Sequence, residues 1–445
     1  MKIKTQKSIS LIVIISYVLI RIRFTILADP IFDVYDSPAY FLFTIYPTVR
    51  LQGVTLIYNI LESYKAIIIF QSFIGTLSTV LLWFALSKLF RRELEKLLFT
   101  LLFFILFSSS PVVEHDAALL SESLSISSLQ ILIGAFVLNL LSNFKSSYGI
   151  LGLILSVIFF VSTKNSHSLI VPILIPILIF TIIRNNNFRI FHKFLYSTLS
   201  VGAITFFFIA GQSTKDFETL STNAIINNRL WENPDWRQQV IQSGYSEKLH
   251  EIWLTHANFN LGSPPDQAVA DKLEFQKWWR EGGDNFLIEF GIDNPTYTLL
   301  GPIFLPLLDS SQNYRKTLLS GWSQGTDYSR IYPELSNSNL VRTYFWPDEP
   351  EKAYLVLSIT FILIGFSLIS NFFYGNKSYA WLLIALVTFI FLSSFPNWWF
   401  GSKPGDMARH NLESAIMWRV AGLLAGLFLL TELWSRLSKK FKEYW

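Results

Sequence analysis

The chain has 445 residues, of which 51% are hydrophobic, 15% are charged and 40 are Phe. Soluble domains carry a larger charged fraction, so this composition excludes a soluble globular protein and indicates that lipid is the main solvent. The absence of Cys excludes disulfides, thiolate metal sites and a cysteine nucleophile. The net charge of +4 gathers near the termini and in short connections, so it indicates membrane orientation, and we expect no nucleic-acid partner.

Apolar runs long enough to cross a bilayer recur along the chain. They lie near residues 9–27, 65–90, 97–110, 117–142, 148–162, 168–184, 193–211, 353–371, 379–395 and 414–434. We therefore predict an all-α integral membrane protein with about ten transmembrane helices. The first run is too long for a signal-peptide core and no small-residue cleavage site follows it, so we expect an uncleaved span.

Basic residues fall on one side of the predicted membrane. Placing the N-terminal lysines in the cytoplasm puts every later basic connection on the same side, as the positive-inside rule requires. Both termini are then cytoplasmic, in a cell membrane that we take to be a bacterial inner membrane. The carboxylates of the remaining connections gather on the external face, which is where we expect the active site.

The pattern divides the chain into three parts. Residues 1–211 form an N-terminal transmembrane module of about seven helices with external catalytic loops, and residues 353–445 form a C-terminal module of about three. Residues 212–352 are too polar for a connection and rich in Trp, so we predict a large, mainly helical periplasmic domain. Within it, the apolar run 296–308 contains two prolines. We interpret it as a re-entrant or interfacial helix, because an eleventh span would place the basic C-terminus outside.

The first external loop carries Asp33, Asp36 and Tyr40 just beyond the first span. A carboxylate at the membrane edge is partly buried, which raises its pKa and suits general-base chemistry on a lipid-linked substrate. Alternatively, these aspartates cap local turns.

The second external loop carries Glu114 and Asp116, and Glu122 follows inside the next predicted helix. An intramembrane carboxylate is expensive, so Glu122 should face the bundle interior and mark a site. Glu114 and Asp116 could hold a divalent cation, Mg²⁺ or Mn²⁺, if substrate phosphates completed the shell. An acidic helix N-terminus explains the same pair without a metal, and we predict no other cofactor.

Two further external turns carry cations. Lys164 could contact a phosphate, although a snorkelling anchor at the membrane edge is the simpler interpretation. Arg409, where the final run begins, is well placed to pair with a phosphate headgroup. Trp398 and Trp399 precede it, and we interpret them as part of an interfacial aromatic belt.

Together these features resemble the GT-C superfamily of membrane glycosyltransferases, which includes protein O-mannosyltransferases, aminoarabinose transferases and the catalytic subunits of oligosaccharyltransferases. The resemblance lies in the first 170 residues or so and in the last external turn. Its motifs are Asp36-Ser37-Pro38-Ala39-Tyr40 after the first span, Leu120-Ser121-Glu122-Ser123-Leu124 after the acidic stretch, and Arg409-His410 before a late span.

The resemblance implies a GT-C-like fold and inverting sugar transfer from a polyprenyl-phosphate donor to a lipid, glycan or protein acceptor. Asp36 would be the catalytic base, and Arg409, His410 and Lys164 would bind the lipid phosphate. Asp36 is followed by Ser37 where the O-mannosyltransferases have a second carboxylate, so Asp33 is the alternative base.

Two other classes of protein combine many spans with lipid-linked substrates. An O-antigen ligase or polymerase would place its chemistry on Arg and His of the external domain, here Arg280, Arg315, Arg330 and His250. A transporter or flippase would carry polar or broken segments near the bilayer midplane. The predicted spans are mostly uncharged and their polar groups gather at one face, which favours an enzyme.

Overall fold

The computed structural model describes residues 3–31, 52–164, 215–259, 265–301, 331–332, 345–346, 350–373, 377–400 and 411–443, with scattered positions between 167 and 205. Within these residues the chain is helical, and the one strand-like contact is a bridge between Ile31 and Ala118. The predicted all-α class is therefore confirmed.

The helices fall into an N-terminal group, an outer group and a C-terminal group. The N-terminal group comprises α1 (Ile3–Leu27), α3 (Gln52–Leu61), α4 (Tyr64–Ser87), α5 (Glu93–Phe107), α6 (Ser110–Val113), the 3-10 helix η1 (Glu114–Asp116), α7 (Glu122–Leu141) and α8 (Ser147–Thr163). The outer group comprises α12 (Lys215–Ile225), η2 (Ile226–Leu230), α13 (Pro234–Gln242), α14 (Glu247–Phe259), α15 (Pro265–Ala270), α16 (Leu273–Trp278), η3 (Trp279–Gly283), α17 (Phe286–Asp293) and η4 (Thr296–Leu300). The C-terminal group comprises α22 (Pro350–Phe373), α23 (Lys377–Phe400) and α25 (Leu412–Glu443).

Five of these helices, α1, α4, α7, α22 and α25, contain stretches long and apolar enough to cross a membrane. A sixth span arises if α5 and the bent segment Ser110–Asp116 count as one. Two shorter apolar helices are Ser147–Thr163 and Tyr379–Ser394. The chain is thus a multi-pass membrane protein. Ten spans stay a prediction, because the runs 168–184 and 193–211 lie largely outside the described residues.

The expected span 97–110 differs from the structure in one respect. α5 ends at Phe107, and the chain turns by 63° before continuing as Ser110–Asp116. Ser109 is extended, with ψ 152°, and Pro111 lies in the first turn of α6. Proline lacks the N–H that would continue the α5 ladder and its ring clashes with the preceding turn, so the helix breaks here.

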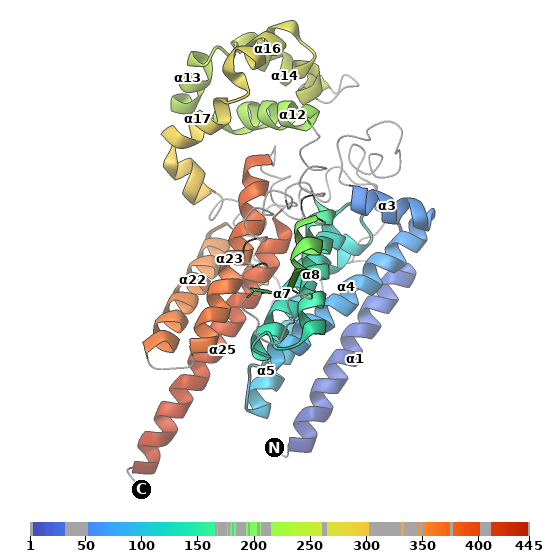
Figure 1. Ribbon diagram of the computed structural model, residues 1–445, viewed down its shortest axis with the longest axis vertical. Helices are drawn as coiled ribbons and strands as arrows, with labels where there is room; N and C mark the ends of the chain where they lie inside the picture. The colour runs from blue at the N-terminus through green and yellow to red at the C-terminus, as the bar shows by residue number, and fades with distance from the viewer. Residues whose placement is uncertain are drawn as a thin grey trace.

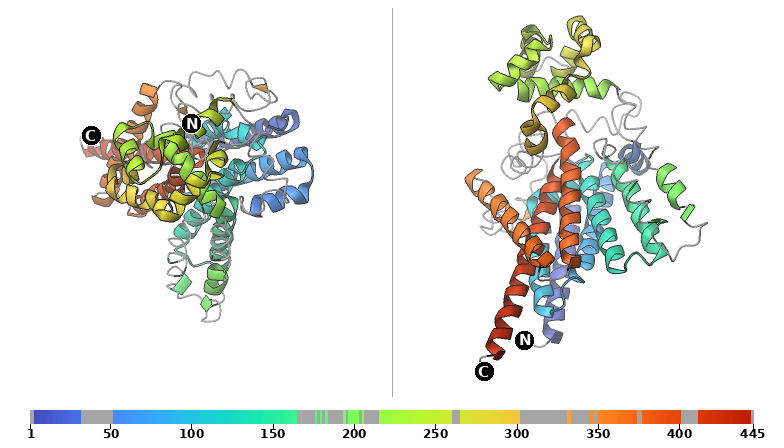
Figure 2. Two further views of the ribbon diagram at one scale, coloured as in Figure 1. Left: turned by 90° about the horizontal axis from the view of Figure 1, so that it is seen from above. Right: turned by 60° about the vertical axis from the view of Figure 1, so that its left-hand side comes forward.

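The long helices of the N- and C-terminal groups run side by side, with both chain termini at one end of the bundle and the outer helices at the other (Figure 1). We call the latter the outer end. α7 packs on α4 and α8, and α25 packs on α22 and α23. Contacts of α25 with α5 and α7 join the two groups, and the views of Figure 2 show the same arrangement. Termini on one side agree with the predicted topology, and their cytoplasmic location stays a prediction.

Trp398 joins the outer helices to the end of α23. Its side chain is 2% exposed and packs on Tyr297, with ring centroids 4.9 Å apart. Arg229 lies over the indole, 4.7 Å from its centroid, and donates a hydrogen bond to the Trp398 carbonyl. Gly301 is close enough that an added Cβ would overlap the ring. The belt interpretation of Trp398 is therefore wrong, because the outer helices cover this residue.

His250 is packed among the aromatic side chains of the outer helices. Its ring stacks on Trp231 at 4.4 Å and lies parallel to Trp253 at 6.2 Å, and its Nδ1 is 2.8 Å from Asn227 Oδ1. Burial, with a smaller effect of Arg237, lowers the pKa of His250 from 6.5 to about 4. The unfolded chain therefore binds more protons than the folded chain between these two values.

We expect the outer helices to lose stability as the pH falls from about 6.5 to about 4, because protonation of His250 favours the unfolded form. His250→Gln should flatten this dependence, whereas Thr255→Ser, at an exposed residue of the same helix, removes no titratable group and should not. The measurement is amide hydrogen exchange of residues 215–259 in the full chain, corrected for the intrinsic pH dependence of exchange. An unchanged pH profile in His250→Gln would contradict the assignment.

Candidate functional site

Two buried polar clusters meet at the first turn of α7, near the outer end of the bundle. Glu122 begins this helix and is 2% exposed, so the prediction that it faces the interior is confirmed. Ser123 donates to Asp116 Oδ1 at 2.9 Å, and Ser125 donates to the carboxylate of Glu413. One helical turn thus connects both clusters.

The first cluster centres on an ion pair between Arg21 of α1 and Asp116 of η1. Their side chains are 2% and 4% exposed. Two buried charges are tolerable only when their geometry and hydrogen bonds compensate for the lost hydration. Asp116 meets this condition through Arg21 and Ser123, and Gly75 on α4 leaves room for the guanidinium. The Asp116 carboxylate is therefore paired with Arg21 inside the bundle.

The chain that leaves α1 is tied to the same acidic segment. Lys65 donates three hydrogen bonds, at 2.8–2.9 Å, to carbonyl groups at the end of α1. The Ile31 N–H donates to the Ala117 carbonyl at 2.8 Å, and the Leu119 N–H donates to the Ile31 carbonyl at 3.0 Å. The segment with Asp33, Asp36 and Tyr40 begins directly after Ile31, and these three residues lie outside the described residues.

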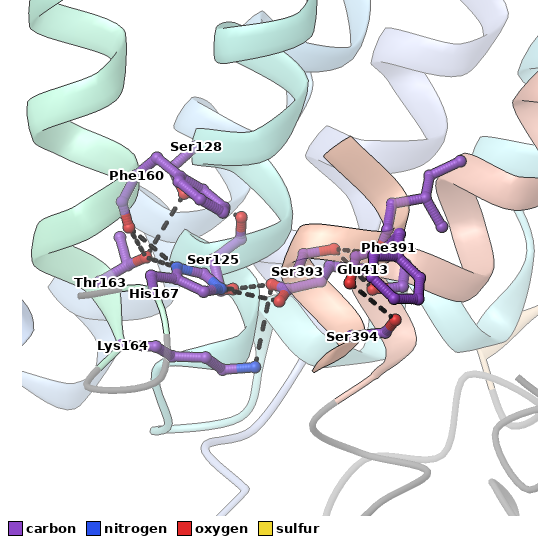
Figure 3. A network of polar contacts seen from close by, with 12 residues as sticks. Ser125, Ser128, Phe160, Thr163, Lys164, His167, Phe391, Ser393, Ser394 and Glu413 are labelled. Atoms are coloured by element: carbon purple, nitrogen blue, oxygen red, sulfur yellow. Dashed lines mark hydrogen bonds and ion pairs between the residues drawn. The ribbon is translucent and has the colours of Figure 1, made fainter. Parts of the chain in front are cut away.

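The second cluster joins α7, α8 and α25 (Figure 3). Glu413, 1% exposed, lies 2.8 Å from His167 Nε2 through Oε1 and 3.8 Å from Lys164 Nζ through Oε2. Ser125 donates to the same carboxylate. His167 stacks on Phe160 with ring centroids 3.9 Å apart. The cluster is thus a buried carboxylate held by a cation, an imidazole and a hydroxyl.

Both ring nitrogens of His167 have polar neighbours. Its Nδ1 is 2.9 Å from the Phe160 carbonyl oxygen and 3.2 Å from the Thr163 hydroxyl, and its Nε2 is 2.8 Å from Glu413 Oε1. These contacts hold the imidazole in place between α8 and α25.

Lys164 does not act as the predicted snorkelling anchor. Its side chain is 7% exposed and points into the bundle toward Glu413 (Figure 3). An anchor would place its ammonium group in the water outside the membrane. The anchor interpretation is wrong because a buried carboxylate draws the ammonium inward.

Sequence reasoning missed Glu413, His167 and Arg21. The signal for two of them was present, since a charge within or beside a predicted span marks a site in the same way as Glu122. Arg21 lies inside the run 9–27, and Glu413 directly precedes the run 414–434. Nothing in the pattern around His167 distinguishes it.

The remaining predicted residues are only partly located. Glu114 lies on η1 and is half-buried. Arg409 and His410 lie outside the described residues, but Asn411, which follows them, is buried beside the start of α25. Among the residues that the structure describes, no three His, Asp or Glu side chains come together as metal ligands. A cation at Glu114 and Asp116 would therefore need ligands from elsewhere.

Comparisons with known proteins add no relatives: no family model matches the chain, and neither a curated protein nor a solved structure matches it.

Gly75→Ala should disturb the first cluster. The new Cβ would overlap the Arg21 guanidinium, which must then shift within its pair with Asp116. We expect a loss of about 1–3 kcal/mol, the usual range for overpacking a buried site. Gly152→Ala is the matched control, because a Cβ there has nothing within 4 Å. The test is the apparent Tm of both variants in detergent, and equal Tm values would argue against the tight fit.

Glu413→Gln should weaken the second cluster, because it leaves Lys164 and His167 without a buried anion. Removing one partner of a buried ion pair costs on the order of 3 kcal/mol, so we expect a marked fall in apparent Tm. Glu432→Gln on the same helix is the control, since Glu432 accepts from Ser370 in a partly exposed setting. If both substitutions lowered the apparent Tm by the same small amount, the charge of Glu413 would not be important for stability.

Proposed function

We propose that the chain is a membrane glycosyltransferase of the GT-C type, which transfers a sugar from a polyprenyl-phosphate donor to an acceptor at the external face. The observation that supports this most is the convergence of buried charges from α1, η1, α7, α8 and α25 at the outer end of the bundle. Charges buried among apolar helices are expensive and mark functional sites by default.

The position of the clusters suits a lipid-linked substrate. Lys164 directly follows the last residue of α8, near the outer end of the bundle, which is the level at which we expect a lipid phosphate. Glu413 lies three residues after His410 in sequence, so its cluster is close along the chain to the proposed phosphate-binding residues Arg409 and His410. The second substrate is the acceptor, which is a lipid, a glycan or a protein.

The proposed reaction is an inverting displacement. Asp36, or alternatively Asp33, takes the proton of the acceptor hydroxyl, whose oxygen forms a bond to the anomeric carbon. The bond between that carbon and the phosphate oxygen breaks, and polyprenyl phosphate leaves with the electron pair. Arg409, His410 and Lys164 stabilise its charge, an effect that we expect to exceed that of the base. If Mg²⁺ or Mn²⁺ takes part, Glu114 and the substrate phosphate are the ligands to test.

An O-antigen ligase or polymerase is the alternative, and the outer helices offer it less support. His250 is stacked between tryptophans and bonded to Asn227, as a packing residue would be. Arg280 is exposed on η3, and Arg315 and Arg330 lie outside the described residues. A transporter or flippase ranks lower, because the charges gather at one end of the bundle.

The direct test is binding and turnover of a panel of polyprenyl-phosphate sugars by the purified protein. Asp36→Asn should retain binding but lose about 10²–10⁴-fold in turnover, as expected for a lost general base. Arg409→Ala should lose binding. Asp29→Asn, an exposed aspartate in the same connection, should behave like the wild type.

Two outcomes would reject the proposal. Normal turnover in a folded Asp33→Asn, Asp36→Asn double variant would exclude both bases. No binding of any polyprenyl-phosphate sugar by the wild type would favour the ligase or the transporter.

A further inference from the structure

Between the outer helices and α22 the structure describes residues 331–332 and 345–346, and both lie against the bundle; we call them the first and the second return. At the first, Ile331 is buried in a hydrophobic cluster with Phe24 of α1, and the Tyr332 hydroxyl donates to the Ile20 carbonyl at 2.9 Å. Ile20 precedes the end of α1 by seven residues, which corresponds to about 10 Å at 1.5 Å per residue. This contact therefore lies well below the outer end of α1.

The second return is held by Arg419 of α25, which is 8% exposed. Its Nε donates to the Phe345 carbonyl at 2.5 Å, and its guanidinium lies 3.8 Å from the ring centroid of Trp346. Arg419 Nη1 also donates a hydrogen bond, at 2.8 Å, to the Ala415 carbonyl in the preceding turn. Arg419 follows Leu412, the first residue of α25, by seven residues, so this contact is also about 10 Å deep.

The membrane explains why an arginine stands here. At membrane depth a backbone carbonyl needs a protein donor, and the last carbonyls of a helix, where Phe345 lies, have none within the helix. Arg419 supplies such a donor to Phe345, and its planar cation stacks on the adjacent indole. An intramembrane Arg is rare, and this one contacts both the Phe345 backbone and the Trp346 ring.

Both returns contact the segment that carries Asp116. Trp346 Nε1 donates to Ser109 Oγ at 3.0 Å, at the break between α5 and α6. Ser109 itself donates to the Leu106 carbonyl at 2.5 Å. At the other end of the segment, Ile331 shares its cluster with Val113 and Ala117. The acidic segment is thus held near both of its ends.

We propose that Ile331, Tyr332, Phe345 and Trp346 form a clamp on the acidic segment, and that Trp346 and Arg419 are positioning residues for the pair of Asp116 with Arg21. The clamp provides a physical route by which acceptor binding at the outer helices alters the buried carboxylates. That last step rests on the proposed function, whereas the clamp itself does not.

Trp346→Phe tests the clamp. It keeps an aromatic ring beneath Arg419 but removes the N–H that reaches Ser109. We expect amide exchange of residues 108–117, in the full chain, to accelerate about three- to tenfold, as the loss of one buried hydrogen bond predicts. Trp418→Phe is the matched control, because Trp418 is equally buried beside Arg419 and its N–H has no hydrogen-bond acceptor among the described residues. Unchanged exchange in Trp346→Phe, or equal acceleration in both variants, would overturn the proposal.

Arg419→Lys provides a second, independent variant, which keeps the charge but loses the planar fork. We expect faster exchange at 345–346 and at 108–117 together, and a change confined to 345–346 would reject the coupling. Binding of a polyprenyl-phosphate sugar, measured in parallel, should weaken in both variants. If the wild type binds none, the proposed function fails, while the exchange data still decide whether the clamp exists.

Discussion

A charge buried among apolar helices needs an opposite charge or a hydrogen-bond partner within a few ångströms, and this requirement organises the outer half of the bundle. Apolar contacts select poorly between helices in lipid, since the lipid tails are as apolar as the side chains. The pair of Arg21 with Asp116 specifies where α1 meets the acidic segment, and Glu413 specifies where α25 meets α7 and α8. Polar pairing therefore determines which helix ends come together.

The features predicted correctly from the sequence are those encoded over one continuous stretch. An apolar run is sufficient to predict a span, and Glu122 could be placed in the interior because its run is apolar around it. Trp398 and Lys164 were misinterpreted for the opposite reason. Both have the composition of a membrane-edge residue, but their burial depends on groups distant in sequence, the outer helices for Trp398 and Glu413 for Lys164.

The partners within the site could not be predicted from the sequence. Arg21 and Asp116 are 95 residues apart, and His167 and Glu413 are 246 residues apart. The pattern can identify each charge as unusual, but it contains no information on which charge faces which. The resemblance to GT-C enzymes depends on Asp36 and Arg409, which lie outside the described residues. It therefore stays a resemblance. The buried clusters support it only because they lie at the outer end of the bundle.

The long sequence separation of Glu413 from its partners also orders the assembly of the bundle. Synthesis proceeds from the N-terminus, and earlier segments insert before later ones have been made. Lys164 and His167 therefore enter the membrane while the carboxylate that completes their cluster is still unsynthesised. Until α25 inserts, these two side chains lack the carboxylate that they contact in the folded protein. Closure of this end is thus a late event, coupled to insertion of the helix that bears Glu413.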